Sequence, residues 1–176
     1  MASEVAISKL SLRKCSRLAW VACLFCLPAI AHAANNCPWL TEATASGIVG
    51  ADAVGTYTAA SGAQPAVCTF TQKDEGMARS LTITVEIAKD PHTRMTSIAQ
   101  VCGANAATLN AIGNEAVYCS ADARRGELDE RAVGRVRDQV FTITLTSKVK
   151  VDPILTRDSM KTRIYTAAEQ VAGNLF

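Results

Sequence analysis

The segment Arg131-Ala-Val-Gly-Arg135-Val-Arg137 holds three arginines at a spacing that suits recognition chemistry. Alternate side chains of a strand share a face, so a strand here turns the three arginines and Val133 the same way. Guanidinium groups bind carboxylates and phosphates through their fixed fork of N–H donors. We therefore expect an anion-binding or partner-binding surface at Arg131, Arg135 and Arg137. The alternative is a solvated face whose charge is neutralised by neighbouring acids, with Glu86, Glu127 and Glu130 as the candidates.

Catalytic chemistry has few candidate residues in this chain. His92 is the only histidine after His32, so any Ser-His-Asp or Cys-His arrangement would have to use it. It follows Asp90-Pro91, a pattern typical of the start of a helix, and we expect it to be exposed. No phosphate-binding loop, nucleophile elbow or H-E-x-x-H motif occurs in the sequence. We expect a protein that is not an enzyme, with no catalytic residue, cofactor or metal site.

A run of acidic residues between Asp122 and Glu130 is the one place that could suggest metal or carboxylate chemistry. It lacks the D-x-D-x-D-G spacing of a calcium loop and contains two arginines. Glu127 and Asp129 could act as a glycosidase pair, but a turn does not hold two carboxylates at a fixed separation. We expect a charged, solvated hairpin loop over residues 122–130.

Cysteine usage predicts two disulfides. Cys15, Cys23 and Cys26 lie in an apolar N-terminal segment, which leaves four cysteines in the remainder of the chain: Cys37, Cys68, Cys102 and Cys119. Four cysteines allow three pairings, and they lack the close pairs that zinc sites use. We favour Cys37–Cys68 and Cys102–Cys119 because each closes a loop between neighbouring elements.

The first 33 residues have the three parts of a secretory signal peptide. A basic stretch precedes an uncharged run from Leu18 to Ala31, and Ala31-His32-Ala33 matches an A-x-A cleavage site. The apolar run is 14 residues long, whereas a membrane-spanning helix needs about 20. We expect cleavage after Ala33, no stable membrane insertion, and a single domain over residues 34–176.

Charge argues against nucleic acid as a partner. The whole chain has 18 basic and 16 acidic residues, and the expected leader carries four of the basic and one of the acidic ones. The remaining domain is therefore close to neutral. Nucleic-acid binding draws on an excess of basic charge that this domain lacks.

Hydrophobic periodicity predicts the elements that must position these residues. The clearest strand covers residues 79–88, where Leu81, Ile83 and Val85 alternate with threonines and a serine. Thr41 is a suitable N-cap for the first helix. We expect helices at 38–49, 92–101 and 157–174, a small-residue loop up to Pro65, and strands at 67–71, 79–88, 115–120, 131–137 and 140–146.

The order of these elements, αββαβββα, predicts an α+β fold with a five-stranded antiparallel sheet. One sheet face is apolar and the helices are amphipathic. The simplest arrangement packs the helices on that one face and leaves the threonine-rich face to solvent or to a partner.

Three short segments carry a resemblance: Cys37-Pro38-Trp39-Leu40-Thr41 before the first helix, Cys68-Thr69-Phe70 on the first strand, and Ile112-Gly113-Asn114-Glu115-Ala116 before the third. Together they resemble the DUF3558-like family of small exported bacterial domains of unknown function. The resemblance implies the α+β fold and the Cys37–Cys68 disulfide, and it implies no activity. Asn114 stands where the family usually has Asp, and a lipobox is absent.

These features favour a non-catalytic binding or interaction module that is periplasmic or secreted, and whose partner is an envelope component or a protein. A small secreted enzyme using carboxylate chemistry is the alternative from another class. An exported inhibitor or accessory subunit is a third.

Mass spectrometry of protein recovered from the exported fraction checks the first part of this reading. The denatured chain should begin at Ala34 and weigh about 4 Da less than the reduced form, because each disulfide removes two hydrogens. A full-length or lipid-shifted mass would instead indicate a membrane-anchored protein.

Overall fold

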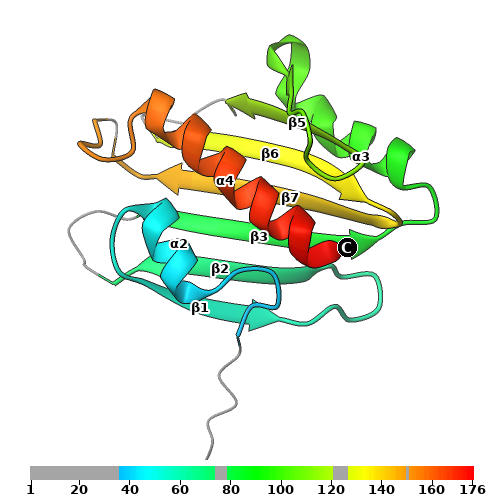
Figure 1. The fold of residues 1–176 in the computed structure, drawn as a ribbon, viewed down its shortest axis with the longest axis horizontal. Helices are drawn as coiled ribbons and strands as arrows, with labels where there is room; N and C mark the ends of the chain where they lie inside the picture. The colour runs from blue at the N-terminus through cyan, green and yellow to red at the C-terminus, as the bar shows by residue number, and fades with distance from the viewer. Residues whose placement is uncertain (1–35, 74–78, 121–126, 150) are drawn as a thin grey trace, which may run out of the picture. The chain divides into compact units, whose positions relative to one another are not determined.

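The computed structural model describes residues 36–73, 79–120, 127–149 and 151–176 (Figure 1). The expected leader therefore lies outside the described residues. The helices are α2 (Glu42–Val49), α3 (Pro91–Ala99) and α4 (Arg157–Leu175), with a 3₁₀ helix η2 (Gln100–Asn105) directly after α3. The strands are β1 (Ala53–Thr58), β2 (Ala66–Gln72), β3 (Arg79–Ile87), β4 (Ala107–Thr108), β5 (Glu115–Ser120), β6 (Leu128–Val136) and β7 (Gln139–Ser147).

The fold is α+β, as expected, and every strand pair is antiparallel. Within the described ranges the sheet has seven strands in the order β1-β2-β3-β7-β6-β5-β4, not five. The two additional strands are β1, inside the expected small-residue loop, and the two-residue β4. The expected order αββαβββα is therefore wrong.

Strand β1 shows no recognisable strand pattern in the sequence because small residues occupy most of its core side. A Cβ on Gly55 would lie 2.8 Å from Cε1 of Phe70, so this position must stay empty for the Phe70 ring to pack. Ala53, the other small inward residue, is buried. The core side of this strand is thus filled by its neighbour β2, and no alternation of large apolar residues appears in β1 itself.

The boundaries of the expected elements need two further corrections. Thr41 is the N-cap of α2, as predicted, and accepts a hydrogen bond from the Thr44 amide; the helix begins at Glu42, not at Pro38. Strand β6 begins at Leu128, so Asp129 and Glu130 are strand residues and not part of a solvated loop. Residues 122–126 of that expected loop lie outside the described part of the chain.

Helices cover both faces of the sheet, which corrects the expectation of a single helical layer. We call the face under α2 and α4 the inner face (Figure 1); it carries the main core, including Leu81, Ile143 and Ile164. Helix α3 packs on the other face, which we call the outer face. There Met95 forms a second cluster with Val133 and Val140. These two valines provide an apolar area among polar neighbours, and α3 covers it.

Two disulfides pair the cysteines as the loop spacing predicted. Cys37–Cys68 and Cys102–Cys119 have Cα–Cα distances of 5.6 Å and 5.4 Å. Cys68 belongs to the inner-face core, while Cys119 lies opposite Arg131 and faces outward. Each bridge therefore ties a non-sheet segment to a different face. Any other pairing of Cys68 or Cys119 would have to pass through the sheet.

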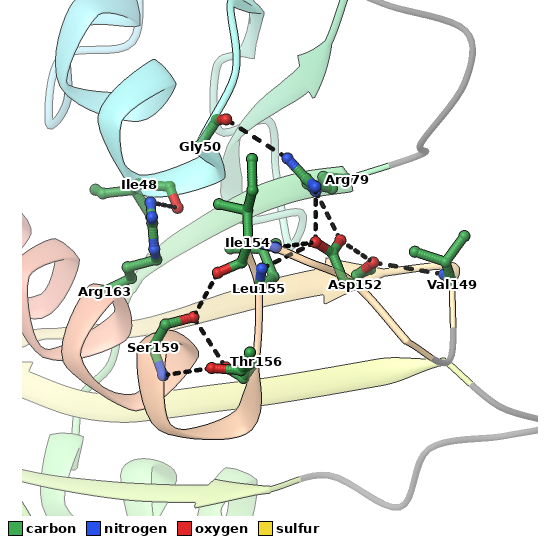
Figure 2. A network of polar contacts seen from close by, with 11 residues as sticks. Ile48, Gly50, Arg79, Val149, Asp152, Ile154, Leu155, Thr156, Ser159 and Arg163 are labelled. Carbon is green, nitrogen blue, oxygen red and sulfur yellow. Dashed lines mark hydrogen bonds and ion pairs between the residues drawn. The ribbon is translucent and has the colours of Figure 1, made fainter.

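A buried ion pair joins segments that are remote in the sequence (Figure 2). Arg79 at the start of β3 donates from Nε and Nη2 to the Asp152 carboxylate at 2.7 Å and 2.6 Å. Ser147 donates to the same carboxylate at 2.7 Å, and the Ile154 and Leu155 amides donate at 2.9 Å. The carboxylate is thereby saturated with donors. It fixes the link between β7 and α4 against β3.

Substituting Arg79 tests how much this pair contributes. Arg79→Met leaves Asp152 buried without its cation, which should lower the free energy of unfolding by about 3–5 kcal/mol. The control Arg94→Met removes an ion pair whose arginine is half exposed, and it should cost at most about 1 kcal/mol. Urea denaturation at pH 7 measures both, and equal losses would contradict a dominant role for the buried pair.

Lowering the pH should reduce the difference in the free energy of unfolding between wild type and Arg79→Met. Burial opposes ionisation of Asp152, but hydrogen bonds from Arg79, Ser147 and two amides together hold the pKa of that carboxyl well below its usual range. A lowered folded-state pKa gives stability that is complete above the unfolded-state pKa of about 3.9 and is lost as pH falls further. A difference in the free energy of unfolding that stays constant down to pH 2 would contradict this assignment.

Candidate functional site

Rows of threonines cross the outer face. Strand register places Thr56 beside Thr69, Thr69 beside Thr82, and Thr82 beside Thr144. Thr144 in turn lies opposite Arg131. A second row contains Thr84 and Thr142. Strand alternation therefore converts a common sequence pattern into an ordered surface of hydroxyl groups that ends at one guanidinium.

A cleft of about 360 Å³ lies over part of this surface, between α3 and the segment before β2. We call it the outer-face cleft. Thr84, Thr142 and Thr144 lie along its sheet side. Its apolar lining includes Ile98 of α3 and Pro65. The cleft exists because α3 packs on the outer face over Val140 and Val133 and leaves the threonines beside them uncovered.

Three charged residues line the outer-face cleft, and two of them neutralise each other. Arg94 donates from Nε and Nη2 to the two carboxylate oxygens of Glu86 at 2.6 Å and 3.2 Å. This two-point contact satisfies both groups and links α3 to β3. The third charge belongs to Arg131.

Arg131 is the charged residue of this cleft without a hydrogen-bonded counter-ion among the described residues. Its Nε is buried and has no hydrogen-bond partner. The nearest carboxylate contact is Asp129 Oδ2, which lies 3.9 Å from Nη2. Asp129 Oδ1 is likewise buried and unpartnered. Burial raises the pKa of the Asp129 carboxyl despite the nearby guanidinium, so this ion pair is poorly formed.

The structure separates the three arginines that the sequence placed on one surface. Arg135 shares the outer face with Arg131 but is bound by Glu115, to which it donates from Nε. Arg137 lies beyond the end of β6, with φ of 56° in the tight turn to β7. Its guanidinium lies 5.7 Å from the centre of the Phe176 ring. The reason is local: the turn ends the strand alternation before Arg137.

His92 belongs to the same ion-pair cluster as Arg135 and is exposed, as the sequence suggested. Its Nδ1 lies 2.6 Å from Glu115 Oε1, and 64% of its side chain is accessible. Hydrogen bonds from Arg135 and His92 lower the pKa of the Glu115 carboxyl. This cluster fastens the first turn of α3 to β5 and β6.

The acidic candidates of the sequence that the structure describes do not form a metal-binding group. Across the described ranges, no set of three His, Cys, Asp or Glu side chains is arranged to hold a metal ion. Glu130 is buried on the inner face, where it accepts hydrogen bonds from the Tyr118 hydroxyl at 2.5 Å and from Ser120. In the same ranges, no helix combines the length and apolarity needed to cross a membrane.

A larger groove of about 650 Å³ lies between α2 and α4 and is a weaker candidate. Its charged lining residue, Arg163, donates to the backbone carbonyls of Gly47 and Ile48 at the end of α2. These carbonyls carry the negative end of the helix dipole, so the arginine serves as a cap. The groove is otherwise lined by Ile48, small residues and hydroxyl side chains.

Sequence reasoning found Arg131 and the threonine-rich face but missed the residues that turn them into a cleft. Ile98 and Arg94 are placed there by α3, which the sequence assigned to the opposite face. The available signal was Val133, an apolar residue between two arginines on a strand. An apolar residue on a polar face indicates that something covers it.

Asp129→Asn tests whether the Asp129–Arg131 contact is poorly formed. A folded-state pKa above the unfolded value means that the charged carboxylate destabilises the fold, and that this cost disappears below the unfolded-state pKa. We expect the variant to be more stable than wild type at pH 7 by about 1 kcal/mol, with the difference shrinking toward pH 4. Urea denaturation across pH measures this. Glu169→Gln, at an exposed carboxylate, should show no such trend, and a destabilised Asp129→Asn would contradict the assignment.

No protein-family model matches this chain, and neither a curated protein nor a solved structure matches it.

Proposed function

We propose that this domain is a non-catalytic binding module of the bacterial envelope or exterior, and that it holds a ligand in the outer-face cleft. The observation that carries the proposal is Arg131: its guanidinium, whose Nε is buried, lines a cleft and lacks a hydrogen-bonded partner among the described residues. Buried donors without acceptors cost free energy, and a bound ligand can supply the missing acceptor.

The composition of the cleft supports binding better than catalysis. Its hydroxyl groups and the guanidinium of Arg131, which lacks a hydrogen-bonded counter-ion among the described residues, can orient a ligand. Proton transfer requires a base within reach of the substrate. The carboxylate that lines the cleft, Glu86, already accepts two hydrogen bonds from Arg94. Nothing in this arrangement favours the carboxylate enzyme that was the alternative from sequence.

The two disulfides support a location outside the cytoplasm, because disulfides persist in oxidising compartments. Together with the leader pattern of residues 1–33, the disulfides are the basis for proposing that the chain is cleaved after Ala33 and that the remaining domain is periplasmic or secreted. The resemblance to the DUF3558-like family is part of the same proposal.

Two substitutions on one strand test the site. Thr142→Phe should fill the outer-face cleft, whereas Thr146→Phe places the same ring on the same face of β7 at a position that does not line the cleft. In two-dimensional NMR, we would add isobutyrate, isobutyramide, isopropylamine and glucose separately to the folded protein. At least one probe should shift the Thr84 and Thr144 amides in wild type and in Thr146→Phe, and not in Thr142→Phe.

The proposal fails if none of the four probes shifts cleft amides, or if Thr142→Phe leaves the response unchanged. Circular dichroism and thermal unfolding of both variants control for folding. If Thr142→Phe does not fold, Thr84→Leu offers a smaller obstruction of the same cleft and should weaken the same response.

A further inference from the structure

The charge balance of the outer-face cleft assigns a chemical class to its ligand, and this step rests on the proposed function. Two of its three charged residues, Glu86 and Arg94, form a two-point ion pair with each other. Arg131 makes no hydrogen bond to any other described residue, and its one carboxylate contact is at 3.9 Å. The guanidinium of Arg131 is therefore the one charged group lining the cleft that has no hydrogen-bonded counter-ion among the described residues.

We propose that the outer-face cleft binds a small monocarboxylate with a short apolar body, and that Arg131 receives the carboxylate. A guanidinium offers paired N–H donors that match the two oxygens of a carboxylate. Thr144 lies opposite Arg131 in the strand register and lines the same cleft. Its hydroxyl is placed to donate a further hydrogen bond to the bound anion.

Nearby acids select a monoanion over a phosphate ester. Glu86 lines the cleft, and Asp129 contacts Arg131 from the neighbouring outward position of β6. A dianion would be repelled strongly by both carboxylates. A carboxylate carries one charge, so the two acids repel it less, and the single guanidinium of Arg131 matches its two oxygens.

The size and lining of the cleft set the rest of the ligand. A volume of about 360 Å³ is near the lower end of the usual range for small-molecule sites. Ile98, Val140 and Pro65 supply apolar surface around the threonines. A branched or short aliphatic chain fits these walls.

Isobutyrate and isobutyramide have nearly the same shape and differ in charge, so they test the assignment directly. Calorimetry and NMR titration at pH 7 should show isobutyrate binding about tenfold or more tightly than isobutyramide, as expected for a charge-assisted hydrogen bond. Methyl phosphate should bind more weakly than isobutyrate. The preference for isobutyrate should decrease at high salt, because this site is partly open to solvent.

Arg131→Gln should abolish the preference for isobutyrate over isobutyramide, and Arg131→Lys should retain part of it by keeping the charge without the planar fork. The control Arg157→Gln makes the same change at an exposed arginine on α4 and should have no effect. If Arg131→Gln fails to fold, the comparison of the probes on wild type still decides.

The possible outcomes separate the two proposals. Equal binding of isobutyrate and isobutyramide in the cleft, or tighter binding of methyl phosphate, overturns the monocarboxylate assignment and leaves a binding module. A preference for isobutyrate that survives Arg131→Gln also overturns it. Absence of cleft shifts with every probe, including isopropylamine and glucose, overturns the proposed function itself.

Discussion

The buried ion pair between Arg79 and Asp152 holds the segment before α4 against β3. It thereby positions α4 on the inner face of the sheet whose outer face carries the cleft. Asp152 lies between the last long strand and the last helix, and five hydrogen bonds to its carboxylate fix that link (Figure 2). Such a pair is costly to desolvate and tolerable only when fully satisfied. Because the ion pair is satisfied, α4 is anchored across the inner face of β6 and β7. The same two strands carry, on their outer face, the valines that α3 covers.

Smaller contacts attach α3 and η2 to the outer face of the sheet. Met95 packs on Val133 and Val140, the Glu115 cluster holds the first turn of α3, and the Cys102–Cys119 disulfide ties η2 to β5. Because α3 is held at both ends over a small apolar area, it leaves the polar surface beside it uncovered. The outer-face cleft is the space that results between α3 and the segment before β2.

Polar satisfaction distinguishes the two faces of β6. The carboxylates of Asp152 and Glu130 both accept several hydrogen bonds, although each is buried. Asp129 and Arg131, which lie in the same strand as Glu130, each retain a buried polar atom without a partner. Unsatisfied groups of this kind are uncommon in folded proteins and are concentrated where a ligand or an ion completes them. This contrast, within one strand, is why the cleft is the candidate site.

The sequence by itself determined the strands with regular alternation, the N-cap at Thr41 and the position of Arg131 on a polar face, and it favoured the disulfide pairing that the structure shows. These features depend on neighbours within a few residues, or on loop length. Only the tertiary structure decided that β1 is a strand, because Phe70 fills the space that its own side chains leave empty. It also decided which side α3 covers and which arginine lines the cleft without a hydrogen-bonded counter-ion. Those outcomes depend on contacts between segments far apart in the chain, such as Arg135 with Glu115, and no local pattern encodes them.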